Sequence, residues 1–192
     1  MRVGIFGGSF NPPHTAHLIV AELVREAGGL DRVLWIPAAR PPHKPEADLA
    51  DADHRLAMTR LAVAGNPAFD VSDLELRRTG PSYTVDTLRA LQTAHPDVAF
   101  TLILGGDSFR DFATWRDPDE IARRVTLLVY DRPGSTYEAV PERFRTRARF
   151  VETPLLAISG TDIRRRVREG RTIRYLVPEP VRQYITAHGL YR

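Results

Sequence analysis

The sequence predicts an α/β fold, a doubly wound parallel sheet, and three observations favour it. Short apolar segments alternate with segments of helical spacing along the 192 residues. Residues 98–104 are continuously apolar, as is typical of a parallel strand covered on both faces. Glycine pairs at 7–8 and 105–106 follow two of the strands, at the ends where such sheets bind their ligands.

The first half of the chain alternates between strands and helices. Residues 2–6 form an expected buried strand that ends before the first glycine pair, and 14–27 carry apolar residues at helical spacing. The next strand covers 32–37 and leads into a proline-rich loop, 38–46. The remaining elements expected in this half are a helix over 51–64, a strand over 69–74 and a helix over 84–95.

The second half continues the same alternation from the strand at 98–104. Short helical pieces over 108–113 and 119–123 lead to a fifth strand at 125–130, and a sixth is expected at 149–151. The segment 131–149 gives the weakest signal. Ser159, followed three residues later by Asp162, predicts a capped helix through Arg168, and residues 179–188 predict a closing helix.

Composition and length narrow the class of protein. With 43% hydrophobic and 27% charged residues, the chain is expected to be globular, as one domain over 1–192 with a small C-terminal helical portion from about 159. The absence of cysteine excludes disulfides, thiolate zinc sites and a cysteine nucleophile. No leader or membrane-spanning stretch is evident, so a cytoplasmic protein is expected. A formal charge of +3 is a weak argument for nucleic-acid binding.

The basic residues are almost all arginine. Of 27 basic residues, Lys44 is the single lysine, and it lies in the proline-rich loop. Two interpretations stay open on this count: a lysine left by compositional bias, or a compact point charge with three rotatable donors that arginine does not supply.

The first candidate site is the segment 7–17, GGSFNPPHTAH, between the first strand and the first helix. Its glycines let backbone N–H groups approach a phosphate, and the helix N-terminus adds a favourable dipole. It matches neither the P-loop nor the GxGxxG pattern. His14 and His17 are three apart and therefore face the same ligand. The residues alone leave phosphate contact, a metal site and capping or packing histidines open.

This segment resembles the HxGH signature of the nucleotidylyltransferase superfamily, the HIGH-type α/β-phosphodiesterases, whose histidines steady nucleoside triphosphate phosphates. Four further motifs occur in order: PPHK at 41–44, SYTVDT at 82–87, GGDSF with a following W at 105–115, and ISGTDIRRR at 158–166. Together they are similar to the bacterial nicotinate-nucleotide adenylyltransferase family over essentially the whole chain. Ala16 stands where many members have Gly, and Gly160 where the family often has a second Ser.

The resemblance implies a Rossmann-like fold and transfer of the adenylyl group of ATP to nicotinate mononucleotide, with Mg²⁺ carried by ATP. The implied catalytic residues are His14, His17, Lys44 and Arg164. The implied ATP-binding residues are Gly7, Gly8, Ser9, Phe10, His14, His17, Asp107, Ile158, Ser159, Thr161 and Arg164. The implied substrate-binding residues are Asn11, Lys44, Ser82, Tyr83, Thr84 and Trp115. No protein metal site, nucleic acid or membrane partner is expected, and self-association is left open.

Plainer roles compete with several of these. Ser82 or Thr84 could simply cap a helix, Trp115 could be a core aromatic, and Asp107 could cap the following turn. If the resemblance holds, backbone groups near Tyr83 and Thr84 hold a pyridine carboxylate while Trp115 stacks on the ring. Arg165, Arg166, Arg168 and residues 143–149 are expected to be solvated.

Rival functions remain inside and outside this class. The alternatives within it are adenylyltransferases acting on nicotinamide mononucleotide or phosphopantetheine, and a cytidylyltransferase on the same fold. The alternative outside it is a basic RNA-binding or regulatory module that retains the fold without turnover, although no aromatic-rich basic strand supports single-strand stacking.

Overall fold

The computed structural model describes residues 1–40, 49–131 and 134–192. Its six strands form one sheet in the order β3-β2-β1-β4-β5-β6. The strands are β1 (Arg2–Gly8), β2 (Arg32–Pro37), β3 (Phe69–Val71), β4 (Ala99–Gly105), β5 (Thr126–Asp131) and β6 (Ala148–Glu152). The order runs outward from β1 in both directions, as in a doubly wound sheet, so the predicted fold class is confirmed.

The pairings on one side of β1 are parallel. Gly4 pairs with Thr101 between β1 and β4, Leu102 with Leu127 between β4 and β5, and β6 pairs with β5 in the same sense. Parallel strands need crossover connections, and the intervening helices supply them.

The helices agree with the predicted positions to within a few residues. They are α1 (Thr15–Gly28), α2 (Ala52–Val63), α3 (Thr84–Ala94), α4 (Gly106–Arg110), α5 (Pro118–Arg124), α6 (Glu142–Arg145), α7 (Gly160–Arg168) and α8 (Glu179–Ala187), with a 3₁₀ turn at Phe112–Thr114. The short helix α6 was not predicted, because four residues are too few to show a helical period. The third strand ends at Val71, three residues earlier than expected.

The chain divides into two compact units, each assembled from three stretches. The first unit comprises 1–6, 20–34 and 82–155, and the second comprises 7–19, 35–81 and 156–192. Since each unit interleaves distant parts of the sequence, neither is the expected C-terminal portion alone. The single domain over 1–192 stays a prediction.

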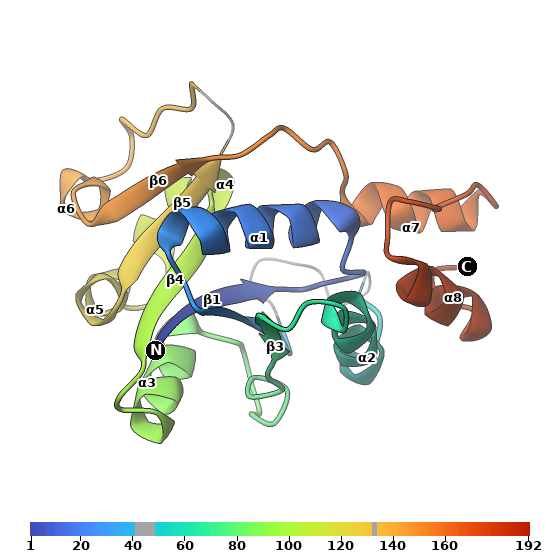
Figure 1. Cartoon of the computed structure of the whole chain (residues 1–192), viewed down its shortest axis with the longest axis horizontal. Helices are drawn as coiled ribbons and strands as arrows, with labels where there is room; N and C mark the ends of the chain where they lie inside the picture. Colours follow the sequence, from blue (N-terminus) through green and yellow to red (C-terminus); the bar gives the residue numbers. More distant parts are fainter. Residues whose placement is uncertain (41–48, 132–133) are drawn as a thin grey trace. The chain divides into compact units, whose positions relative to one another are not determined.

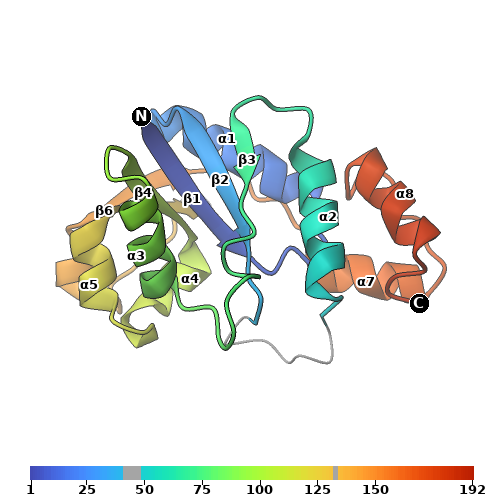
Figure 2. The ribbon, with the colours of Figure 1, turned by 90° about the horizontal axis from the view of Figure 1, so that it is seen from below.

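The core of the first unit lies between β4–β5 and the helices that cover them. Figures 1 and 2 show α3 and α5 side by side on one face of these strands. Leu102 and Leu127 on the strands, Leu88 on α3 and Ile121 on α5 are all buried. Burying each such side chain contributes about 1.5–3 kcal/mol to folding.

The core of the second unit joins three helices. Met58 on α2, Ile163 on α7, and Val181 and Ile185 on α8 belong to one buried apolar cluster. His54 on α2 and Tyr184 on α8 add a polar contact beside it, with Nδ1 and the hydroxyl 2.9 Å apart. This packing fixes α7, the helix that was expected to face the triphosphate, against α2 and α8.

Among the described residues, no helix combines the length and the apolar character needed to span a bilayer.

Candidate functional site

β1 extends through Gly7 and Gly8, two residues past its predicted end, and residues 9–14 after it, called the glycine loop below, contain one buried ring. A Cβ at Gly8 would approach the Phe10 ring to 3.0 Å, whereas one at Gly7 would find open space, so the Gly7 backbone stays accessible. Phe10 has a φ of 44°, which is uncommon for a bulky residue. Its ring is buried against Trp35 and His17, with centroids 5.1 and 5.3 Å away. Phe10 was expected to bind ATP; the structure places its ring in the packing that supports His17.

The two histidines of the loop form one stacked pair. The rings of His14 and His17 have centroids 3.6 Å apart and planes inclined by 22°. The His14 backbone N–H donates to Nδ1 of His17 at 3.2 Å, so neutral His17 carries its ring proton on Nε2. His14 is 6% exposed and His17 is half-buried. The pair therefore lies at the start of α1 with the ring proton of His17 on Nε2, and its contact with phosphate stays a prediction.

Asn11 is a meeting point for three distant segments. Its main-chain oxygen accepts from Arg164 at 2.9 Å, and its side-chain oxygen accepts from the Ala50 N–H at 3.1 Å and from the Tyr191 hydroxyl at 2.8 Å. A Cβ at Gly160 would lie 2.9 Å from the main-chain oxygen, so glycine lets α7 approach this closely. The second serine that the family often has at Gly160 would crowd this contact. The side-chain oxygen of Asn11 thus supports the fold, and the predicted contact of Asn11 with substrate stays a prediction.

The start of α7 carries the predicted cap. The Asp162 N–H donates to Oγ of Ser159 at 3.1 Å, which confirms the capped helix start. Arg164 has a second, longer contact from Nη2 to Oγ1 of Thr161 at 3.4 Å. Ile158 packs against the apolar cluster of α2, α7 and α8. The residues of this segment that were expected to bind the triphosphate are therefore held by contacts within the protein, and their binding role stays a prediction.

Arg55 is a functional candidate that sequence reasoning missed. It is 1% exposed on α2, and its guanidinium donates to four backbone carbonyls. The acceptors are Ala50 at 2.9 Å, Ser9 at 3.0 Å, Ala38 at 2.6 Å and Ala39 at 3.0 Å. Burial lowers the pKa of Arg55 from its ordinary value. Arg55 therefore connects the glycine loop to the backbone on both sides of residues 41–48. The sequence did not single it out, because arginine makes up almost all of the basic residues.

Asp107 stands at the start of α4 in the first unit. Its side chain is fully exposed, and Arg110 donates to its carboxylate at 2.6 Å, while Gly105 occupies the N-cap position of α4. The same guanidinium contacts Asp131 at 3.0 Å, and the Tyr137 hydroxyl donates to Asp131 at 2.7 Å. Burial and this hydrogen bond raise the pKa of Tyr137, which keeps it a donor. A Cβ at Gly106 would overlap the Asp131 carboxylate. The alternative capping role of Asp107 is wrong, and its ligand role stays a prediction.

The start of α3 contains the expected pyridine-binding backbone. Tyr83 occupies the N-cap and makes no capping hydrogen bond through its side chain. Ser82 and Thr84, considered as caps, therefore lie on either side of the cap position. The first N–H groups of a helix have no partner within it, so the backbone at Thr84 can donate to an anion.

Trp115 lies at the end of the 3₁₀ turn with its ring half-buried. It packs against Phe112, with centroids 5.5 Å apart, and is not a fully buried core residue. The next residue, Arg116, places its guanidinium carbon 4.7 Å from the centroid of the Tyr83 ring. This cation–π contact brings the turn at Trp115 to the start of α3. Arg116 was not singled out from the sequence.

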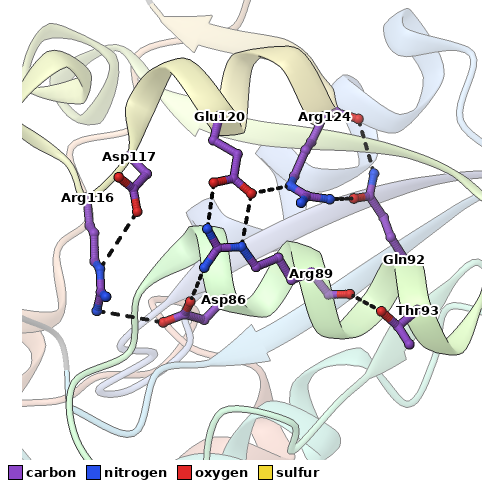
Figure 3. A network of polar contacts seen from close by, with 8 residues as sticks. All are labelled: Asp86, Arg89, Gln92, Thr93, Arg116, Asp117, Glu120 and Arg124. Atoms are coloured by element: carbon purple, nitrogen blue, oxygen red, sulfur yellow. Dashed lines mark hydrogen bonds and ion pairs between the residues drawn. The ribbon is translucent and has the colours of Figure 1, made fainter.

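A network of charged side chains joins α3 to α5 beside this contact (Figure 3). Arg89 donates to both oxygens of Glu120, at 2.9 and 2.5 Å, and contacts Asp86 at 3.0 Å. Arg124 donates to Glu120 at 2.7 Å. These two arginines lower the pKa of Glu120 to about 2. Arg116 reaches Asp86 only at 4.0 Å, so this network fixes α3 against α5 more than it fixes Arg116.

The predicted residues gather in two sets, one in each unit. The second unit contains Gly7, Gly8, Ser9, Phe10, Asn11, His14, His17, Ile158, Ser159, Thr161 and Arg164, and the first contains Ser82, Tyr83, Thr84, Asp107 and Trp115. Lys44 lies outside the described residues. Within the described ranges, no group of three or more metal-ligating side chains occurs.

Comparison with known proteins gives one consistent family. A cytidylyltransferase-like family model matches residues 5–166. A Salinibacter ruber protein is 59% identical and a Thermus thermophilus protein 48% identical, with 100% of this chain and 98% and 100% of those proteins covered; both are named "Probable nicotinate-nucleotide adenylyltransferase".

A solved structure shares the fold. Plasmodium falciparum nicotinic acid mononucleotide adenylyltransferase complexed with NaAD has a TM-score of 0.80 at 20% identity, covering 99% of this chain and 97% of its own. At this identity the likeness concerns the fold. From its family match and its curated relatives, the chain belongs to the cytidylyltransferase-like family and, within it, to the nicotinate-nucleotide adenylyltransferases.

Proposed function

We propose that this chain transfers the adenylyl group of ATP to nicotinate mononucleotide, giving nicotinate adenine dinucleotide and pyrophosphate. The observation that carries the proposal is the stacked His14–His17 pair at the start of α1, in which the His14 N–H donates to Nδ1 of His17 and so sets the tautomer of that ring. The curated relatives' names support the choice of substrate.

The reaction needs no enzyme nucleophile. An oxygen of the mononucleotide 5′-phosphate attacks the α-phosphorus of ATP in line, and the bond from that phosphorus to the bridging oxygen breaks. Pyrophosphate leaves with the electron pair, and the attacking phosphate is already anionic, so no base has to remove a proton. Catalysis then consists of positioning and charge neutralisation. The proposed contributors are His14, His17, Lys44 and Arg164.

The triphosphate is proposed to bind the loop after β1 and the start of α7. The Nε2–H of His17 donates to a phosphate oxygen, and the free end of the Arg164 guanidinium faces the charge that builds on the leaving group. Arg164 uses only one short hydrogen bond, to the Asn11 oxygen, so its other N–H groups can contact phosphate.

Mg²⁺ is proposed to enter with ATP. Mg²⁺ prefers oxygen ligands, keeps several waters and is bound largely through substrate phosphates. Asp107 fits a contact to the magnesium water shell or to ribose hydroxyls, because its carboxylate is exposed and already oriented by Arg110. Bound Mg²⁺ would neutralise phosphate charge as it develops.

The pyridine is proposed to bind at the start of α3. Backbone N–H groups near Tyr83 and Thr84 favour a carboxylate over a neutral carboxamide, and the half-buried Trp115 offers a ring face for stacking. Self-association and a cytoplasmic location stay predictions.

The test is pyrophosphate release with ATP and Mg²⁺, comparing nicotinate mononucleotide with nicotinamide mononucleotide and phosphopantetheine. A preference of about 100-fold or more for the acidic nucleotide is expected when paired donors require a carboxylate. Equal turnover of both pyridine nucleotides would remove the specificity argument. Turnover of none, together with a thermal shift from a short RNA, would favour a binding module.

A substitution tests the role of the histidine pair. His17→Ala should lower kcat far more than it weakens ATP binding, because the proposed contact strengthens in the transition state. His95→Ala is the matched control, since His95 is an exposed residue at the end of α3. Equal losses in kcat and in ATP affinity would assign His17 to ground-state binding.

A further inference from the structure

The geometry around Asn11 extends the site to a residue far along the chain. Asn11 is 5% exposed and precedes His14 by three residues. Its side-chain oxygen accepts two hydrogen bonds, from Tyr191 at 2.8 Å and from the Ala50 N–H at 3.1 Å. The first donor lies 180 residues away and the second lies 39 residues away. One amide oxygen thus joins the glycine loop to two other segments of the same unit.

The backbone conformation and the protonation state of Tyr191 both favour its hydrogen bond to Asn11. Its φ is 66°, a conformation that bulky residues adopt only when their surroundings hold them. Burial raises the pKa of its hydroxyl, so the group stays protonated and remains a donor at neutral pH. The positive charges of Arg55 and Arg164 act on the same hydroxyl, which places it among the residues that fix the loop.

Residues 175–176 bind the chain at Thr15, directly after the glycine loop. The Thr15 N–H donates to the Leu176 carbonyl at 2.9 Å, and its hydroxyl donates to the Tyr175 carbonyl at 2.8 Å. His14 lies between Asn11 and Thr15, and the Phe10 ring next to Asn11 packs on His17. A displacement of Asn11 would therefore move the backbone that carries both histidines.

We infer that Tyr191 is a positioning residue for adenylyl transfer: through Asn11 it sets the backbone that carries His14 and His17. It touches no reacting atom, and the one hydrogen bond of its hydroxyl goes to the side-chain oxygen of Asn11. The inference rests on the proposed function for its kinetic consequence, while the geometric consequence can be measured without turnover.

The experiment compares Tyr191→Phe with Tyr184→Phe in the full chain. Each change removes one hydroxyl that makes one hydrogen bond, to Asn11 for Tyr191 and to His54 for Tyr184. Tyr191→Phe is expected to lower kcat about fivefold, the size of one ordinary hydrogen bond, with little change in KM for ATP. Tyr184→Phe is expected to leave kcat unchanged, even if it lowers the melting temperature as much as Tyr191→Phe does.

Nitrogen-15 NMR of the histidine rings gives a second readout. The imidazole signals of His14 and His17 should shift in Tyr191→Phe and stay in place in Tyr184→Phe. Unchanged kcat with unchanged ring signals would overturn the inference, as would equal changes in both variants. If the wild-type chain turns over neither pyridine nucleotide, the proposed function fails, and the NMR comparison still decides whether Tyr191 positions the pair.

Discussion

Replacing Arg55 by methionine is the perturbation that tests the structure most directly. The side chain is fully buried, and methionine fills much of its volume without any donor. The four carbonyls that Arg55 serves belong to Ser9, Ala38, Ala39 and Ala50. All four lose a charged donor at once, so the variant removes the tie between the glycine loop and α2.

The expected magnitude follows from two opposing effects. A buried acceptor that loses its donor costs about 1–3 kcal/mol, and the four carbonyls belong to half-buried residues, so the gross loss is at most roughly 4–12 kcal/mol. Removing a buried cation returns several kcal/mol of desolvation penalty. We expect a net loss of about 3–5 kcal/mol in the free energy of unfolding. For a chain of this length, that lowers the melting temperature by roughly 10 °C.

The assay is urea and thermal unfolding of Arg55→Met beside Arg60→Met. Arg60 lies on the same helix and is exposed, so its replacement should change the free energy of unfolding by less than about 0.5 kcal/mol. A loss below about 1 kcal/mol for Arg55→Met would refute the reasoning, because the four carbonyls would then be served equally well without the guanidinium.

Three further predictions concern stability. Gly106→Ala should destabilise the chain by about 1–3 kcal/mol in urea unfolding, since its Cβ displaces Asp131 from its partners; Gly65→Ala, with open space around the Cβ, is the control, and equal effects would contradict the overlap. Ser159→Ala should cost about 1 kcal/mol by loss of the α7 cap, and a neutral result would show the cap to be dispensable. The folded pKa of Glu120 is lowered from 4.5 to about 2, so its ion pairs stabilise the fold above pH 4.5, and this contribution disappears as the pH falls through 2. Glu120→Gln should therefore reduce the loss of unfolding free energy between pH 4.5 and 2. An unchanged pH dependence in that range would count against the pairing.

The sequence contained enough information for the fold because the apolar periods are strong. The unbroken apolar segment at residues 98–104 predicts a strand, and the structure confirms it as the largely buried β4. The spacing of Val85, Leu88 and Leu91 predicts a helix, and all three side chains are buried on α3. The helix α6 escaped because its four residues are shorter than the window in which a period can be recognised.

The site was less predictable because its supports act across long separations. The motif indicated that His14 and His17 belong together, and their stacking agrees with that expectation. Nothing local in the sequence connects Asn11 to Tyr191, or Arg55 to Ser9, because such pairs meet only in the folded chain. The substrate contact of Asn11 stays a prediction, and the structure adds a supporting role for its side-chain oxygen that the sequence did not indicate.

The 180-residue separation between Asn11 and Tyr191 also has a consequence in time. A ribosome that adds about 5–20 residues per second makes Tyr191 roughly 10–40 s after Asn11. Through that interval the first helix can form, while the amide of Asn11 lacks the hydroxyl that later fixes it. During that interval the nascent chain carries the glycine loop without the hydrogen bond from Tyr191 that holds Asn11 in the folded chain.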